Sequence, residues 1–210
     1  MNISNLVSNF YFFRKCHIKK ARNRIQNKNF TLIASNCIGG IIYNNLGLRF
    51  NSPTINLQIN SDEFVKLVLN LREYMQKEIK FIEPENGIPV GILGDVKITF
   101  THYHTNEEAL KKWNERKERI NYDNLYIILN DRDGVTEKQI RESGNIKCKN
   151  ICVFTSKDYK DIPYATFFKK YKNQECVGNV LKKSRLTGLR GFESDFDYVG
   201  WLNSDMHYGE

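Results

Sequence analysis

The stretch FTLIASNCIGGII, residues 30–42, decides the fold of this 210-residue chain. Phe30 opens an apolar run of strand length, and the polar turn Ser35-Asn36-Cys37 ends it. Gly39 and Gly40 then open a segment with a helical pattern. A buried strand, a short polar turn and a helix start together form an α/β crevice, where ligands commonly bind. The sequence therefore predicts a ligand site at this turn.

Strand-like and helix-like segments alternate along the rest of the chain. Strands are expected at residues 30–34, 54–58, 88–93, 96–101, 125–129 and 150–155, and helices at 39–46, 61–75 and 105–120 and after residue 136. Strands separated by helices favour a mixed, mainly parallel sheet with helices on its faces. The predicted fold class is therefore α/β with a Rossmann-like layered architecture.

Positive charge is concentrated at the beginning of the chain. Residues 1–28 hold seven Lys or Arg and no Asp or Glu, whereas the other 182 residues are nearly neutral, at +1. We therefore expect a basic N-terminal arm, residues 1–28, followed by a single α/β domain, residues 29–210. A helix in this arm would place Leu6, Val7, Phe10 and Phe13 on one side. It would then either attach to an anionic membrane surface or polymer, or pack on the body of the protein with a solvated basic tail.

The apolar stretches, the first residues and the cysteines of the sequence together predict the cellular compartment. No stretch reaches the length of about 20 apolar residues that a bilayer span needs, and the first residues do not match a secretory signal. Five cysteines form no CxxC pair, which is typical of reduced thiols in a cytoplasm. We expect a cytoplasmic protein, with attachment to the inner membrane surface as the alternative. Because the charge is confined to the arm, no nucleic-acid partner is expected.

Four segments of the chain resemble a known family. They are SNCIGGIIYNNLGLRFNSPTINL at 35–57, IPVGILGDVKITFTHYHTNEEALKKWNERKERIN at 88–121, NDRDG at 130–134 and GFESDFDYVGWLN at 191–203. In this order they resemble an uncharacterised bacterial family commonly labelled exopolysaccharide (capsule) biosynthesis protein, a domain of unknown function. The resemblance implies a role in making surface polysaccharide and supplies no reaction, cofactor or catalytic residue. Ile38 stands where the family pattern has an aromatic residue.

Cys37 is the candidate nucleophile, because a thiolate is reactive and a helix N-terminus lowers the pKa of a thiol. His102 or His104, which follow a predicted strand, would supply the base. The alternative is that Cys37 is a small buried residue at the junction of strand and helix. A third His or Cys near the two histidines is absent from the sequence, so we assign no metal ligand.

The segment Asn130-Asp131-Arg132-Asp133-Gly134 follows another predicted strand. Its two aspartates can bind a divalent cation and, through it, the diphosphate of a nucleotide-sugar. The alternative is a solvated turn, because Asp and Gly adopt loop conformations readily. We take Asp131 as a candidate catalytic residue and Asp133 as a candidate binding residue.

Arg116 shares a helical stripe with Trp113 and Ile120. If this stripe faces the crevice, the planar guanidinium can bind a phosphate or carboxylate. If the stripe instead faces the core, the arginine serves packing.

These candidates combine into two hypotheses of different classes. The first is an enzyme of exopolysaccharide or capsule biosynthesis, a transferase or hydrolase acting on a glycan precursor. Its catalytic residues would be Cys37, His102 and Asp131, and Asn36, Gly39, Gly40, Arg116 and Asp133 would bind a sugar or sugar phosphate. The second is a non-catalytic partner in capsule assembly, attached to the inner membrane surface through residues 1–28. The sequence identifies no cofactor, and it leaves open whether the protein is an enzyme.

Overall fold

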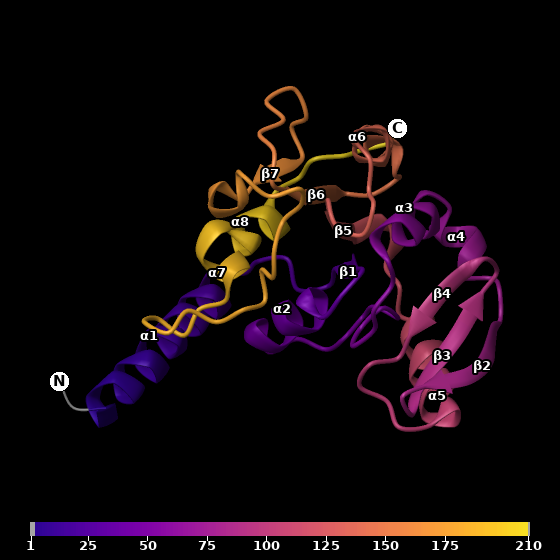
Figure 1. The fold of residues 1–210 in the computed structure, drawn as a ribbon, viewed down its shortest axis with the longest axis horizontal. Coiled ribbons are helices and arrows are strands. Elements are labelled where there is room, and N and C mark those ends of the chain that lie inside the picture. The colour runs from indigo at the N-terminus through magenta and orange to yellow at the C-terminus, as the bar shows by residue number, and fades with distance from the viewer. Residues whose placement is uncertain (1–2, 210) are drawn as a thin grey trace.

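The protein is described from a computed structural model, which covers the backbone of residues 3–209 and the side chains of residues 12–209. Figure 1 shows a long N-terminal helix that projects from a body built around two β-sheets. The helices are α1 (Ile3–Arg24), α2 (Ile38–Leu46), α3 (Ser61–Leu69), α4 (Leu71–Tyr74), α5 (Asn106–Lys117), α6 (Glu137–Glu142), α7 (Gly191–Asp195) and α8 (Tyr198–Asn203). The strands are β1 (Thr31–Ala34), β2 (Ile79–Glu85), β3 (Ile88–Leu93), β4 (Val96–Thr99), β5 (Leu125–Asn130), β6 (Asn150–Thr155) and β7 (Ala165–Phe167).

The first sheet is parallel, with the strand order β1-β5-β6-β7. Ala34, the last residue of β1, pairs with Ile128 of β5, and Asn130, the last residue of β5, pairs with Phe154 of β6. The carboxyl ends of these three strands therefore lie at one edge. The mixed α/β class is confirmed, as are the strands that were expected near residues 30, 125 and 150.

The second sheet is antiparallel and separate, with the order β2-β3-β4, so the expectation of one mixed sheet is wrong. The predicted strand at 54–58 is also wrong, because Asn56 has a left-handed backbone with φ 62°. Its carbonyl accepts a hydrogen bond from the Thr101 hydroxyl at 3.1 Å instead of a strand partner. Only Gln58 makes a bridge, to Thr99.

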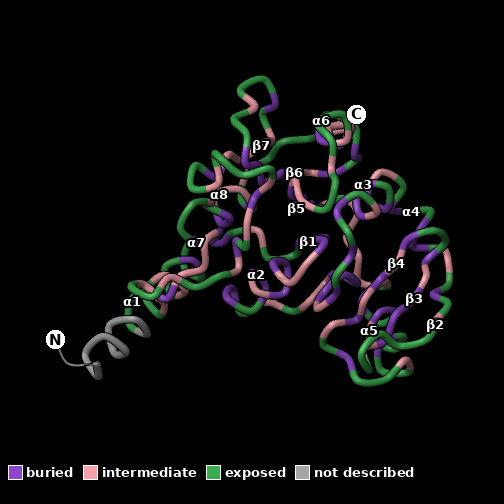
Figure 2. The backbone as a smooth tube through the Cα atoms, in the orientation of Figure 1, coloured by how far each residue is buried: buried purple, intermediate pink, exposed green. Residues whose placement is uncertain are grey.

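The parallel strands alternate their side chains between two buried clusters. Ile33, Ile127 and Ile151 pack in the cluster that holds α3 and the antiparallel sheet. Leu32 and Tyr126, which point the other way, pack in the cluster that holds α2, α7 and α8. Figure 2 shows buried backbone on both sides of the parallel sheet.

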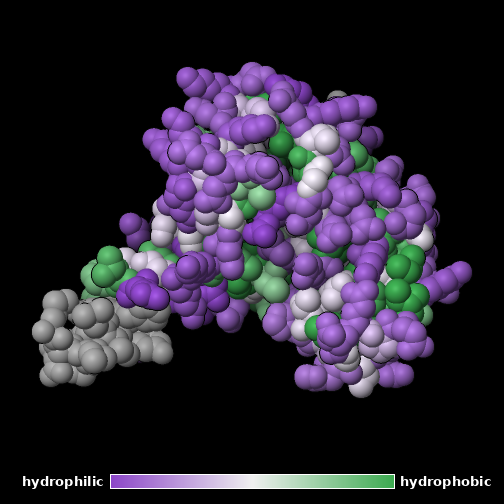
Figure 3. Space-filling view, in the orientation of Figure 1, coloured by the Kyte–Doolittle hydropathy of each residue, from purple (hydrophilic) through white to green (hydrophobic). Residues whose placement is uncertain are grey.

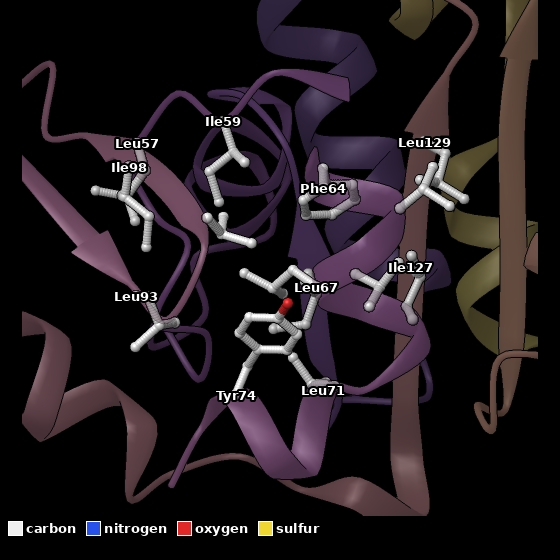
Figure 4. Close-up of a cluster of buried hydrophobic side chains, with 14 of the residues drawn as sticks. Leu57, Ile59, Phe64, Leu67, Leu71, Tyr74, Leu93, Ile98, Ile127 and Leu129 are labelled. Carbon is white, nitrogen blue, oxygen red and sulfur yellow. The ribbon is translucent and has the colours of Figure 1, made fainter. Parts of the chain in front are cut away.

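Helix α3 joins the two sheets. Figure 4 shows Phe64 and Leu67 lying between Ile98 of the antiparallel sheet and Ile127 of the parallel sheet. Asn70 ends α3, so the segment expected as one helix to residue 75 continues as the short α4. Complete burial of each large apolar side chain contributes about 1.5–3 kcal/mol to the free energy of unfolding, so α3 couples the sheets.

The second half of α1 packs on the body. Ala21 and Ile25 are buried, Arg14 forms an ion pair with Glu193 at 3.3 Å, and Arg24 forms one with Asp197 at 2.6 Å. The predicted apolar side formed by Leu6, Val7 and Phe10 lies outside the described side chains. The domain boundary at residue 28 stays a prediction. Within the described residues, no helix combines the length and apolar character that crossing a bilayer requires.

Candidate functional site

A pocket of about 220 Å³ opens at the carboxyl ends of β1, β5 and β6. The carboxyl edge of a parallel sheet is where ligands of α/β proteins bind. Ile128 and Phe154 form an apolar floor, and the other strand-end residues are polar. The polar lining consists of Ser35, Asn36, Gln58, Asn130, Arg132, Asp133 and Asn179.

A buried hydrogen-bond network holds one wall of the pocket. The Asn130 side-chain amide donates to the Ser35 hydroxyl at 3.2 Å. The Ser61 hydroxyl lies within hydrogen-bond distance of Asn130 Oδ1, at 3.0 Å, and of Asp133 Oδ2, at 3.1 Å. The network therefore joins the ends of β1 and β5 to the start of α3. Because its members are fixed by one another, the wall is preorganised for a ligand.

Arg132 supplies a positive charge to the pocket. It is half-buried, and its backbone N–H donates to Asn130 Oδ1 at 3.1 Å. Among the residues that the structure describes, no Asp or Glu forms an ion pair with its guanidinium. The start of α2 at Ile38 also lies at the pocket, and a helix N-terminus favours an anion. Asp133 is the opposing negative charge in the lining, and Ser61 contacts its carboxylate.

Asn36 confirms the expectation that the turn after β1 reaches the pocket. Its Oδ1 accepts a hydrogen bond from the Ile38 N–H at 3.0 Å, which fixes the start of α2. Gly39 and Gly40 are absent from the lining. A Cβ at Gly40 would lie 3.2 Å from Asn56 Oδ1, and one at Gly39 would lie 3.6 Å from the Ala34 Cβ. The glycines therefore allow α2 to pack closely, and their role in ligand binding stays a prediction.

Cys37 and His102 lie in contact beside the pocket. Cys37 Sγ is 3.5 Å from His102 Nε2, so the expected pairing of this cysteine with a histidine is confirmed as a contact. Burial raises the pKa of the Cys37 thiol, and a hydrogen bond with Thr101 opposes this only in part. The pKa of this thiol therefore lies above its ordinary value, opposite to the direction expected from the helix N-terminus, because desolvation disfavours the thiolate. Thus the resting group is a thiol with a base within reach.

Cys37 lies between two lining residues, Asn36 and Ile38, but its own side chain is not part of the lining. His102 is exposed, as is His104. The pair therefore lies beside the lining, at a position that we call the rim of the pocket.

The Asp131 carboxylate is occupied by hydrogen bonds from the protein. It accepts from the Ser156 N–H at 2.7 Å, the Ser156 hydroxyl at 3.0 Å and the Val177 N–H at 2.6 Å. These bonds join the loop after β5 to the loop after β6 and to the segment at residue 177, which lines the pocket. The contacts are structural, and the catalytic role of Asp131 stays a prediction.

Arg116 is buried in the body of the protein. Its guanidinium donates to the Ile55 carbonyl at 3.2 Å and to the Tyr103 hydroxyl, and it is not part of the pocket lining. Its neighbour Trp113 is also buried, which matches the core alternative for this stripe. Its proposed role as an anion ligand has no supporting contact.

Across the described residues, no three His, Cys, Asp or Glu side chains gather as a ligand set for a metal ion. The lining also includes residues that the sequence did not single out, namely Ser35, Gln58, Arg132 and Asn179. Ser35 belongs to the turn Ser35-Asn36-Cys37, and Arg132 belongs to the segment NDRDG. Both segments follow predicted strands, so this position in the sequence could have identified the two residues. Nothing in the local sequence marks Gln58 or Asn179.

Comparison with known proteins places this chain in a family. Residues 8–203 match the family model described as "Domain of unknown function (DUF1919)", and the chain belongs to this family. It is also 37% identical over 182 residues to a protein of Haemophilus influenzae described as "Uncharacterized protein". That alignment covers 87% of this chain and 88% of the relative. Family membership thus extends through the second half of α1, the pocket and α8.

Proposed function

We propose that this protein is an enzyme of surface exopolysaccharide or capsule biosynthesis, a transferase or hydrolase that acts on a glycan precursor in the cytoplasm. The observation that carries the proposal is the polar pocket at the carboxyl edge of the parallel sheet with the Cys37–His102 pair at its rim. The alternation of the parallel strands between two clusters supports a Rossmann-like layering for the domain. The sequence resemblance to the exopolysaccharide family supports the choice of pathway.

The pocket suits a sugar phosphate. The side-chain amides of Asn36, Asn179 and Gln58 can both donate to and accept from sugar hydroxyls. Asn130 can only donate, because its Oδ1 already accepts from the Ser61 hydroxyl and the Arg132 N–H. The Arg132 guanidinium can bind a phosphate with two parallel hydrogen bonds.

The Cys37–His102 pair supports covalent chemistry. In the proposed step, His102 Nε2 takes the proton of the Cys37 thiol as sulfur bonds to the electrophilic atom of the precursor. The leaving group departs with the electron pair of the broken bond and takes that proton from the imidazolium. Water then displaces the sulfur in a hydrolase, and an acceptor hydroxyl does so in a transferase. His102 would remove the proton from either of them and pass it to the departing Cys37 sulfur, which restores the thiol.

Thermal-shift measurements test ligand binding. A ligand at 100 times its dissociation constant adds about 2.7 kcal/mol to the free energy of unfolding, and each kcal/mol raises the Tm of a chain of this size by about 2–4 °C. We expect a sugar phosphate or nucleotide-sugar to raise the Tm of the wild type and of Lys138→Gln, an exposed control. Arg132→Gln should lose this shift. Equal shifts in all three proteins, or none with any sugar phosphate, would contradict the proposed site.

Turnover of the ligand found in that screen tests the chemistry. Cys37→Ser and His102→Gln should retain the thermal shift and lose turnover, because they alter the rim and not the pocket. Full turnover by both variants would exclude the proposed pair.

A non-catalytic role in capsule assembly at the inner membrane is the second candidate function. Exposed Phe12 and Phe13, next to exposed Lys15 on α1, favour it. If cells that carry Cys37→Ser, His102→Gln or Arg132→Gln make as much surface polysaccharide as the wild type, this function replaces the enzymatic one.

A further inference from the structure

The exposed apolar side chains of the protein are unevenly distributed. Of the large apolar side chains that the structure describes, the three most exposed are Leu186 at 75%, Phe12 at 62% and Phe13 at 52%. The next is Met206 at 46%. Exposed aromatic and aliphatic side chains that stand together mark interaction surfaces. The position of these three therefore needs an explanation.

Leu186 lies at the tip of a small hairpin, residues 182–190. Lys183 and Arg190 form its bridge, and the Ser184 N–H donates to the Leu189 carbonyl at 2.7 Å. Three exposed cations, Lys182, Lys183 and Arg185, stand next to Leu186. The tip thus presents one apolar side chain within a group of positive charges.

The hairpin is held against α1 by one buried carboxylate. Glu193 Oε2 accepts a hydrogen bond from the Arg190 N–H at 2.6 Å, at the base of the hairpin. Glu193 Oε1 lies 3.3 Å from the Arg14 guanidinium of α1. Phe12 and Phe13 come directly before Arg14. Figure 1 draws the hairpin, in orange, beside α1, and Figure 3 shows apolar atoms next to the grey N-terminal residues at this end of the molecule.

On α1 and the hairpin, the exposed charged side chains that form no ion pair with a described residue are positive. Lys15, Lys19 and Lys20 are exposed on α1. Neither these three nor the three hairpin cations form an ion pair with any described Asp or Glu. On the helix, Phe12 and Lys19 fall on one stripe, at i and i+7, opposite the buried Ala21 and Ile25.

We propose that α1 and the 182–190 hairpin together form a docking surface for an anionic lipid bilayer. Phe12, Phe13 and Leu186 would insert among the lipid headgroups, and the six cations would contact the anionic lipids. Apolar side chains next to Lys and Arg are the combination that binds such surfaces. The surface extends beyond the basic arm, because the hairpin lies far from it in sequence. It is independent of the pocket, and it deepens the second candidate function, whose attachment to the membrane rests on the same residues of α1.

Flotation of the full chain with vesicles tests this surface. One vesicle preparation is an equal mixture of phosphatidylcholine and phosphatidylglycerol, and the other is phosphatidylcholine alone. The hairpin variant is Lys182→Ala/Lys183→Ala/Arg185→Ala, and the apolar variants are Leu186→Ser and Phe12→Ser/Phe13→Ser. The control, Lys80→Ala/Lys111→Ala/Lys138→Ala, removes the same charge from exposed positions on β2, α5 and α6. Circular dichroism confirms that each variant folds.

We expect the wild type and the control to float with the anionic vesicles only, and to be released by high salt, which screens exposed charges. Loss of three cations near an anionic surface lowers the partition coefficient by about 100-fold, so the hairpin variant should stay in solution. The two apolar variants should also bind more weakly. The proposal is overturned if the wild type does not bind, or if the control loses as much binding as the hairpin variant. It is also overturned if size-exclusion chromatography shows that the wild type is a dimer and the apolar variants are monomers, while all of them bind the vesicles equally.

Discussion

At the scale of single residues, the environment of Cys37 favours a thiol that ionises by proton transfer over a preformed thiolate. A cysteine at a helix start is often described as a preformed thiolate. Here the thiol is half-buried, its pKa is raised by desolvation, and a histidine ring stands 3.5 Å away. The group is therefore suited to ionise when its proton can move to His102. A substrate that excludes water from the thiol would still allow this proton transfer from Cys37 to His102.

Alkylation of Cys37 by iodoacetamide should follow this raised pKa. In a Cys16→Ser/Cys176→Ser background, the other cysteines, Cys148 and Cys152, are buried. We expect the rate at Cys37 to reach half its maximum at a pH above the ordinary thiol value of about 8.5. Peptide mapping by mass spectrometry measures the rate. A midpoint below neutral pH would show a preformed thiolate instead.

Gly91 in β3 is a residue whose side chain is excluded by packing. A Cβ at this position would collide with Ile79 Cγ2 and would lie 3.3 Å from the Phe100 ring. Gly91→Ala should therefore reduce the free energy of unfolding by about 1–3 kcal/mol, as measured by urea denaturation. Gly39→Ala is the matched control, because its nearest neighbour is at an ordinary 3.6 Å. Equal losses in the two variants would contradict this explanation.

At the scale of elements, the turn between β3 and β4 is fastened to the helices that cover it. Asp95 in this turn pairs with Lys66 of α3 at 2.8 Å and accepts a hydrogen bond from the Tyr74 hydroxyl at the end of α4. The hydrogen bond from Lys66 and then the one from Tyr74 lower the pKa of Asp95 to about 2. The antiparallel sheet is thus tied to α3 and α4 by charge as well as by its core.

This lowered pKa predicts a pH dependence of stability. Because the folded value lies below the unfolded value of about 3.9, the stabilisation is complete above about pH 5 and is lost as the pH falls through 4 toward 2. The difference in Tm between the wild type and Asp95→Asn should therefore shrink over that range. Asp158→Asn serves as the control, since Asp158 is exposed and pairs with no described cation. If this difference in Tm did not change with pH, the charge of Asp95 would not be the source of its stabilisation.

The elements also show what the sequence could and could not predict. The apolar runs of β1, β5 and β6 are buried on both faces, so their sequence identified them directly. In contrast, β2 was missed because it is an edge strand that is mostly exposed and contains Pro84. The segment 54–58 has the alternation of a strand, but side chains distant in sequence, such as Arg116, bind its carbonyls.

The candidate site was predictable only where it follows strands. Asn36 and Asp133, which line the pocket, belong to short polar segments that follow apolar runs. The contact of Cys37 with His102 followed from the same reasoning about strand ends. Asn179 and Gln58 reach the pocket through tertiary packing of irregular segments, which no local pattern records. Arg116 was misplaced because the stripe it shares with Trp113 gives no indication of which way the helix faces.

At the scale of the whole molecule, the two buried clusters share the parallel sheet, and each has its own tryptophan. Trp113 of α5 belongs to the cluster with the antiparallel sheet, and Trp201 of α8 packs on the other cluster. These are the two tryptophans of the chain. Each cluster can therefore be followed separately by fluorescence.

We expect the two clusters to unfold together, because β1, β5 and β6 each contribute side chains to both. In urea, Trp113→Phe and Trp201→Phe should each retain a single fluorescence transition, and each transition should coincide with the loss of far-ultraviolet circular dichroism of the same variant. If fluorescence and circular dichroism of one variant gave different midpoint urea concentrations, the two clusters would unfold independently.

The bonds that join α1 to α7 and α8 also govern how the protein is made. Arg14 and Arg24 emerge from the ribosome long before Glu193 and Asp197, the residues with which they form ion pairs. Ala21 and Ile25, at the end of α1 and just after it, pack in the cluster that includes α7 and α8, so this part of their cover forms only after those helices are made. A nascent chain with such a delay is a natural client for chaperones that shield exposed apolar surface until its partners are made.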